Sequence, residues 1–240
     1  KWAPPNPYLN RGALYADHLN EYDKAIADFL RVISFPDKNH PSQIDASKNL
    51  GLVYNKSGDF NNAVKVLDEA IAMDLQQPVS HFLRGAALAG LGKFSEAEKA
   101  YSKALSLDPG YADAWLKRGI LYTDHMGAYD KGIADFRKVL ELLPGDKNAS
   151  VNLGICYFRK KMTDDALQIF SREINADPGD GMLYYLRFLA YAAKNDFEQA
   201  YNDIMKARSL GVSISDQEMN DAMKKAKINV STAGSAAKRE

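Results

Sequence analysis

The sequence repeats with a period of about 34 residues, and this period constrains the fold more than any other feature. Six pairs of residues three positions apart mark the repeats: Gly12 and Tyr15, Gly51 and Tyr54, Gly85 and Leu88, Gly119 and Tyr122, Gly154 and Tyr157, and Phe188 and Tyr191. The steps between successive pairs are 39, 34, 34, 35 and 34 residues. A fixed step of this size predicts similar units that each stack on their neighbours.

Each repeat contains two runs of apolar residues at spacings of three and four, which is the pattern of one helix face. In the second run a small residue stands four positions before a large one; the small residues are Ala25, Ala63, Ala97, Gly132, Ala166 and Ala200. A left-handed residue is expected to end the first run, at Asn20, Gly58, Gly92, Gly127 and Asn195, with Lys161 as the one departure. The sequence therefore predicts six helical hairpins whose helices approach closely.

This pattern resembles the tetratricopeptide repeat family over about residues 6–211. Trp115 alone supplies the tryptophan typical of the family's first helix, and Phe188 stands where glycine is usual, which predicts looser packing in the last hairpin. The resemblance implies an all-α fold, a right-handed α-solenoid of six hairpins. The expected units are about 6–38, 44–77, 78–111, 112–146, 147–180 and 181–211, after an N-terminal linker at 1–5.

A further helix is expected after the sixth unit, within residues 213–228. Ser215 and Glu218 have the spacing of a capping box, and Ile214 can pack on Met219. This capping helix is expected to cover the last unit with a face made of Met219, Ala222, Met223 and Ala226. Residues 229–240 contain too few apolar side chains to pack and are expected to form a flexible tail.

Composition limits the classes of partner. Lys plus Arg and Asp plus Glu both number 31, so the chain has no excess positive charge that would attract nucleic acid. Nucleic acid is therefore not expected as a partner. The longest uncharged stretch is much shorter than the ~20 residues that a membrane-spanning helix needs, so no membrane span is expected. The single cysteine, Cys156, excludes an intrachain disulfide. Because the chain begins at Lys1 without Met or a signal sequence, we interpret it as a processed product or a fragment, and both the cytoplasm and the cell envelope stay open as compartments.

The stretch LYADHLNEYDKAIADF at 14–29 returns as LYTDHMGAYDKGIADF at 121–136, which indicates a three-repeat block present twice. Asp17 with His18 and Asp124 with His125 are predicted to lie in the turns between helices, exposed to solvent. Each pair offers two ligands at most, whereas a metal needs three or four. Helices three repeats apart lie too far from each other to share an ion. We therefore expect no metal site at these pairs.

Other residues with reactive side chains have structural explanations. Cys156 follows Gly154 on a helix face directed at the neighbouring helix, so a buried, packed thiol is expected. His40 lies in a linker, and His81 lies at the start of a helix. No phosphate-binding loop, paired histidine ligands or nucleophile elbow is present. The sequence predicts no catalytic residues and no cofactor, and therefore a protein that is not an enzyme.

In the family that this chain resembles, the first helix of each repeat lines a concave surface that binds proteins or peptides. The matching positions are Lys48, Asn49, Asn55, Lys56, Ile120, Asp124, Asn152, Phe158, Arg159, Tyr185 and Leu189. The two blocks differ there, since Lys48 and Asn55 of the first correspond to Val151 and Phe158 of the second. Large aromatic residues such as Phe158 and Tyr185 anchor many interfaces, although packing between repeats is the alternative.

One branch of the family binds the C-terminal carboxylate of chaperones through Lys and Asn side chains. Lys48 matches the first of these positions, but Leu52 and Leu83 replace two asparagines, which argues against that mode. The expected function is a non-enzymatic scaffold that binds a protein or peptide partner in its groove. The alternative is a structural role, in which the chain forms a homo-oligomer or joins a larger assembly through its convex or end surfaces.

Overall fold

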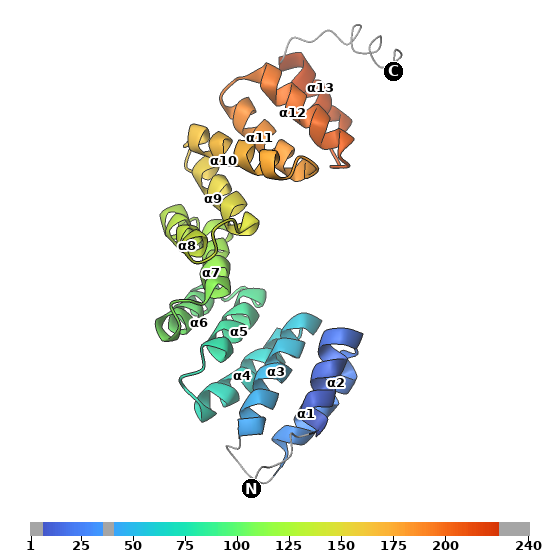
Figure 1. Cartoon of the computed structure of the whole chain (residues 1–240), viewed down its shortest axis with the longest axis vertical. Helices are drawn as coiled ribbons and strands as arrows, with labels where there is room; N and C mark the ends of the chain where they lie inside the picture. Colours follow the sequence, from blue (N-terminus) through green and yellow to red (C-terminus); the bar gives the residue numbers. More distant parts are fainter. Residues whose placement is uncertain (1–6, 36–40, 226–240) are drawn as a thin grey trace. The chain divides into compact units, whose positions relative to one another are not determined.

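The structure is a computed structural model that describes residues 7–35 and 41–225 (Figure 1). Over these residues the regular elements are all helices, which confirms the predicted fold class. Four predictions fall partly or wholly outside the described residues: the linker at 1–5, His40, the end of the capping helix, and the tail at 229–240.

The chain divides into two compact units, residues 1–126 and 127–240. Unit 1 contains α1 (Pro7–Leu14), the π-helix η1 (Tyr15–Leu19), α2 (Tyr22–Ile33), α3 (Pro41–Ser57), α4 (Phe60–Met73), α5 (Pro78–Gly90), α6 (Phe94–Leu107) and α7 (Ala112–Asp124). Unit 2 contains α8 (Tyr129–Leu142), α9 (Lys147–Arg159), α10 (Thr163–Ala176), α11 (Gly181–Ala193), α12 (Phe197–Ser209) and α13 (Asp216–Lys225). The hairpins α1–α2, α3–α4, α5–α6, α9–α10 and α11–α12 each pack helix against helix, as predicted.

Small residues on the first helix of a hairpin allow the second helix to lie close. A Cβ added at Gly51 would lie 2.5 Å from Leu67 Cγ, and one at Gly154 would lie 2.6 Å from Phe170 Cε1. Gly12 against Phe29 and Gly85 against Tyr101 are equally close, at 2.7 Å. Real Cβ atoms do not approach other atoms to such distances, so the large residue occupies the space that glycine leaves.

The last hairpin departs from this rule without losing contact. Phe188 replaces the glycine of α11, but the opposing residue of α12 is Ile204, which is smaller than the phenylalanine or tyrosine at this place in most of the other hairpins. Phe188 packs against the buried cluster that contains Ile204, and α11 and α12 are in contact along their lengths as the other hairpins are. The prediction of looser packing there is wrong, since α11 and α12 pack as closely as the helices of the other hairpins.

The turns follow the prediction at every hairpin. Asn20, Gly58, Gly92, Gly127 and Asn195 all have positive φ angles, between 52° and 80°. Lys161, the departure from the sequence pattern, has the same conformation with φ of 63°. The left-handed conformation of the turn is therefore kept at Lys161, although a residue with a side chain adopts it less favourably than glycine.

The first and fourth repeats have one residue more than the others between their two landmark positions, Gly12 to Ala25 and Gly119 to Gly132. In the first repeat this extra residue is taken up inside a helix. The π-helix η1 adds it to the last turns of the first helix, so Asp17 and His18 lie in η1 and not in the turn that the sequence predicted. Their equivalents are placed differently: Asp124 is the last residue of α7, and His125 is its C-cap. All four residues are exposed, as expected.

The capping box forms as predicted. Ser215 donates from its backbone N and its Oγ to Glu218 Oε2, at 3.0 and 2.7 Å, and Glu218 N donates back to Ser215 Oγ at 3.2 Å. Ile214, Met219 and Ala222 are buried together against α12. Helix α13 thus covers the apolar face of the last hairpin with the residues that its described part contains.

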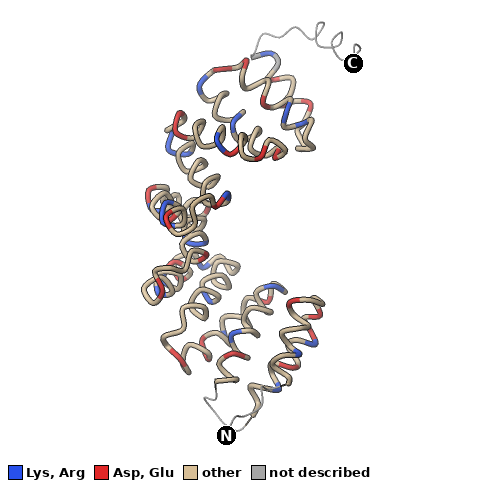
Figure 2. The backbone as a smooth tube through the Cα atoms, viewed as in Figure 1, with Lys and Arg blue, Asp and Glu red and all other residues tan. Residues whose placement is uncertain are grey.

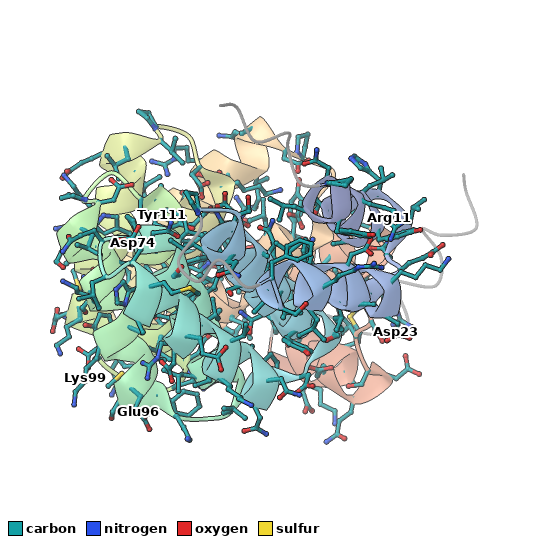
Figure 3. The ribbon with its side chains drawn as sticks, turned by 90° about the horizontal axis from the view of Figure 1, so that it is seen from below. Arg11, Asp23, Asp74, Glu96, Lys99 and Tyr111 are labelled. Carbon is teal, nitrogen blue, oxygen red and sulfur yellow. The ribbon has the colours of Figure 1, made fainter. Side chains whose placement is uncertain are left out.

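Charges of both signs are mixed along the helices (Figure 2). Asp23 on α2 and Glu96 and Lys99 on α6 are exposed charges of this kind (Figure 3). This distribution agrees with the balanced composition of the chain.

Three aspartates are exceptions among the described residues, because they are buried: Asp28, Asp135 and Asp203. Asp28 Oδ2 accepts from Arg11 Nε at 2.7 Å, and Asp203 Oδ2 accepts from Arg187 Nε at the same distance. The guanidinium of Arg11 lowers the pKa of Asp28. Each pair ties the first helix of a hairpin to the second. These pairs were not predicted from the sequence, although each arginine directly precedes the position usually held by glycine.

We expect Arg187→Met to destabilise the protein by about 2–3 kcal/mol, because it leaves the carboxylate of Asp203 buried without its cation. The matched control is Arg84→Met, which removes an arginine at the same repeat position that pairs with Asp68, a residue whose side chain is 52% exposed. This control is expected to cost less than about 1 kcal/mol. Urea unfolding followed by circular dichroism measures both, and equal losses would contradict the role assigned to Asp203.

We expect docking of α13 to weaken in acid, because hydrogen bonds from Ser215 and then Tyr185 hold the pKa of Glu218 below its usual value of 4.5. A carboxylate with a lowered folded-state pKa stabilises above its unfolded pKa and loses that effect as pH falls through the folded pKa. Hydrogen-exchange protection of α13, corrected for intrinsic rates, should thus fall below about pH 4.5 in the wild type. In Glu218→Ala it should be low already at pH 6; unchanged protection at pH 6 would show that the capping box is dispensable.

Candidate functional site

In unit 1, the candidate binding residues of the first block lie on α3, which contacts the first helices α1 and α5 on its two sides. Lys56 Nζ lies 3.3 Å from Asp17 Oδ1 of η1, and Asn55 Nδ2 donates to the Leu83 carbonyl of α5 at 2.9 Å. Lys48 forms an ion pair with Asp45 at 2.7 Å within α3. Lys56 and Asn55, which were predicted to bind a partner, thus connect α3 to η1 on one side and to α5 on the other.

Asn49 and Asn55 are only partly accessible. The Oδ1 of Asn55 is buried and accepts no hydrogen bond within the part of the chain that the structure describes. On α7, Ile120 is half-buried and Asp124 is exposed. On the same helix the guanidinium of Arg118 lies 4.8 Å from the centre of the Trp115 ring. The surface of unit 1 is therefore mainly polar and held in place by internal contacts.

In unit 2, three candidates lie together on α9. Asn152 donates to the Asn148 carbonyl one turn earlier at 2.8 Å, which turns its amide group back along the helix. Phe158 is half-buried, and Arg159 at the end of the helix is exposed. Arg159 forms no ion pair among the described residues. A large aromatic side chain and a free cation thus stand next to each other on α9.

The remaining candidates, Tyr185 and Leu189, are half-buried on α11. The Tyr185 hydroxyl donates to Glu218 Oε1 of α13 at 3.4 Å, and its ring centre lies 5.7 Å from that of Phe188. Burial and the nearby charge of Glu218 raise the pKa of Tyr185. Tyr185 therefore takes part in the packing of α13, which is the alternative that the sequence left open.

The residues with reactive side chains are engaged in structural contacts. Cys156 is fully buried, as predicted. His81 is buried and lies 3.3 Å from the Leu75 carbonyl, and burial lowers its pKa. His125 stacks on Phe94, with ring centres 4.2 Å apart, which the sequence did not predict.

Within residues 7–35 and 41–225, no three His, Cys, Asp or Glu side chains converge as metal ligands would. In the same residues, no helix has both the length and the apolar character to cross a membrane.

Comparison with known proteins agrees with the repeat architecture. Family models described as tetratricopeptide repeat match residues 49–77, 78–111 and 125–187. The human Tetratricopeptide repeat protein 16 is 29% identical over 142 residues, which are 56% of this chain and 16% of that protein. The chain therefore spans only a small part of the length of this relative.

Two solved structures share the fold. A tetratricopeptide repeat protein from Parabacteroides merdae ATCC 43184 superposes with a TM-score of 0.68 at 20% identity, over 92% of this chain and 97% of its own. YrrB, described as a TPR protein with an unusual peptide-binding site, gives a TM-score of 0.67 at 20% identity, over 83% and 98%. With its repeat period, its hairpins and the matches of the family models, this chain belongs to the tetratricopeptide repeat family.

Proposed function

We propose that the protein is a non-catalytic scaffold that binds a peptide or a segment of another protein along the first helices of its repeats. The observation that carries this proposal is the pair of neighbouring residues Phe158 and Arg159 on α9. One offers a half-buried aromatic ring, and the other offers an exposed guanidinium without an internal partner. An aromatic anchor beside a free arginine is the combination that dominates binding energy at many protein interfaces.

The other candidate residues on the first helices differ in how free they are to contact a partner. Leu189 adds an accessible apolar side chain on α11, whereas Tyr185 is shared with the packing of α13. Lys48, Asn55 and Lys56 are occupied by internal contacts, so a partner would have to compete for them. We therefore place the main anchor in unit 2 and assign the α3 residues of unit 1 a minor, mainly electrostatic part.

A non-catalytic role is supported by the environments of the reactive groups. Nucleophilic chemistry needs an accessible thiolate or an activated hydroxyl, and Cys156 is fully buried. His81 on α5 lies against the Leu75 carbonyl, and His125 after α7 stacks on the Phe94 ring. YrrB is described as having a peptide-binding site, and we propose that this chain also binds a peptide.

The test begins with a peptide selected from a random display library against the whole chain. We expect Phe158→Ala with Arg159→Ala to weaken its binding more than tenfold, because an anchor of this type contributes ~2 kcal/mol or more. The control pair Lys48→Ala with Lys56→Ala, both on α3, should change affinity less than threefold and mainly alter its salt dependence. Fluorescence anisotropy measures the affinities.

Circular dichroism must show that each variant keeps its helical content and melting temperature. If the Phe158 and Arg159 variant is folded and binds normally, or if the lysine pair dominates, the proposed anchor is wrong. Sedimentation of the free protein tests the structural alternative. Concentration-dependent self-association that Phe158→Ala leaves unchanged would favour an assembly role through other surfaces.

A further inference from the structure

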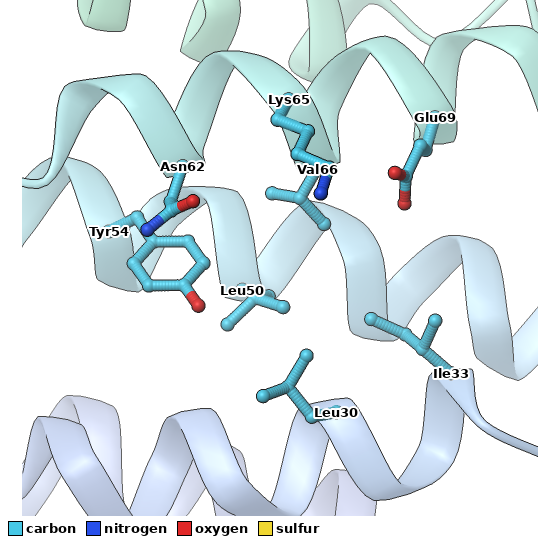
Figure 4. A pocket seen from close by; sticks show the side chains of 8 residues that line it. All are labelled: Leu30, Ile33, Leu50, Tyr54, Asn62, Lys65, Val66 and Glu69. Atoms are coloured by element: carbon cyan, nitrogen blue, oxygen red, sulfur yellow. The ribbon is translucent and has the colours of Figure 1, made fainter.

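A pocket of about 130 Å³ opens between α2 and α4, above the middle of α3 in unit 1 (Figure 4). Its apolar walls are Leu30, Ile33, Leu50 and Val66. Its polar groups belong to Tyr54, Asn62, Lys65 and Glu69. None of these residues belongs to the first-helix surface described above. The mixed lining suits a side chain with an apolar stem and a polar head.

The second block contains the same place with a different set of side chains. The apolar residues are conserved in kind, since Ile33, Leu50 and Val66 correspond to Leu140, Leu153 and Ile169 of unit 2. Leu30, however, corresponds to Arg137, and Tyr54 to Tyr157.

In unit 2 the guanidinium fills this place. Arg137 Nη2 donates to the Tyr157 hydroxyl at 2.7 Å. In unit 1 the Tyr54 hydroxyl forms no hydrogen bond with any described residue. The chain therefore contains two forms of one location, with the tyrosine hydroxyl paired to an arginine in unit 2 and without such a partner in unit 1.

A second arginine is also missing from the first block. In unit 2, Arg172 Nη2 donates to Ser150 Oγ at 2.6 Å. The equivalent residues of unit 1 are Glu69 and Ser47. Ser47 Oγ is buried and has no partner in the described part of the chain. Buried hydroxyl groups are nearly always paired, so unit 1 lacks donors that unit 2 supplies.

We propose that the pocket of unit 1 binds an arginine side chain of a partner protein, in the place that Arg137 fills in unit 2. Its stem would lie between Leu30 and Val66, and its guanidinium would donate to the Tyr54 hydroxyl, as Arg137 donates to Tyr157. The Glu69 carboxylate, at the other end of the lining, would add a negative charge that attracts the cation. Glu69 is exposed and forms no ion pair with a described residue. An arginine is preferred to a lysine because the equivalent place of unit 2 holds a guanidinium on the tyrosine hydroxyl, and a guanidinium is less strongly hydrated than an ammonium group.

Lys65 is the one cation of the lining, and it reduces the attraction of this pocket for a positive charge. It lies one turn from Glu69 on α4 but forms no ion pair with it in the structure. The Lys65 side chain is exposed and can turn away, whereas the hydroxyl and the apolar walls are fixed by the helices. The proposal therefore depends on Tyr54 and the walls first, and on Glu69 second.

The experiment is a titration of the whole chain with N-acetyl-arginine amide, followed through the NMR signals of Leu30, Leu50, Tyr54 and Val66. N-acetyl-leucine amide is the matched probe for purely apolar binding. We expect saturable shifts of these signals with the arginine probe, with a dissociation constant of the order of millimolar for a ligand this small. The leucine probe should leave them unchanged.

Two reciprocal variants use the second block as a guide. Leu30→Arg copies unit 2 and fills the pocket from within, so the shifts at Tyr54 and Val66 should disappear. Arg137→Leu opens the equivalent place, so the arginine probe should now also shift Tyr157 and Ile169. Tyr54→Phe keeps the walls and should weaken binding several-fold, which preserves the test if Leu30→Arg does not fold.

Three results would overturn the proposal. The first is the absence of saturable shifts with the arginine probe at its solubility limit. The second is equal or stronger binding of the leucine probe, which would make the pocket an apolar docking site. The third is binding that persists in folded Leu30→Arg, which would place the probe elsewhere.

Discussion

The hairpins depend on close contact between a small residue of one helix and a large residue of the next. In unit 1, Leu67 occupies the space that the missing side chain of Gly51 leaves, at distances that a Cβ could not share. The contact sets how near the helices lie, and the positive-φ residue of each turn directs the chain back along the first helix. In the last hairpin Phe188 replaces the glycine and packs against the buried cluster that contains Ile204. Glycine is thus not required at every hairpin for the two helices to pack.

The sequence could predict this framework because each part of it is local or periodic. The capping box of Ser215 and Glu218 depends on residues three apart, and the burial of Cys156 depends on its position on a helix face. The π-helix was not predictable in this way, because a spare residue can extend a helix or lengthen a turn at similar cost. Ion pairs such as Arg187 with Asp203 connect residues on two helices, and choosing among nearby acceptors requires coordinates.

The two blocks share a framework, and their side chains differ where the framework leaves a choice. At Leu30 and Arg137 one backbone position carries an apolar wall in one block and a guanidinium in the other. On the first helices, Asn55 contacts a carbonyl of the next repeat, whereas its equivalent Phe158 carries an aromatic ring. Changes of this kind alter what a surface can bind without altering how the hairpins pack. Duplication followed by such changes would give one chain two unequal binding surfaces, which is the basis of both proposals above.

The most direct test of the packing constraint is a double-mutant cycle on Gly51 and Leu67, measured by urea unfolding. Gly51→Ala alone should cost about 1–3 kcal/mol through overpacking, and Leu67→Ala alone about 2–5 kcal/mol through the cavity it leaves. In the double variant the new Cβ enters the space vacated by Leu67, so the loss should be smaller than the sum by about 1 kcal/mol or more. Losses that add within about 0.5 kcal/mol would show that the two residues do not compete for space, and would contradict the account of how the hairpins close.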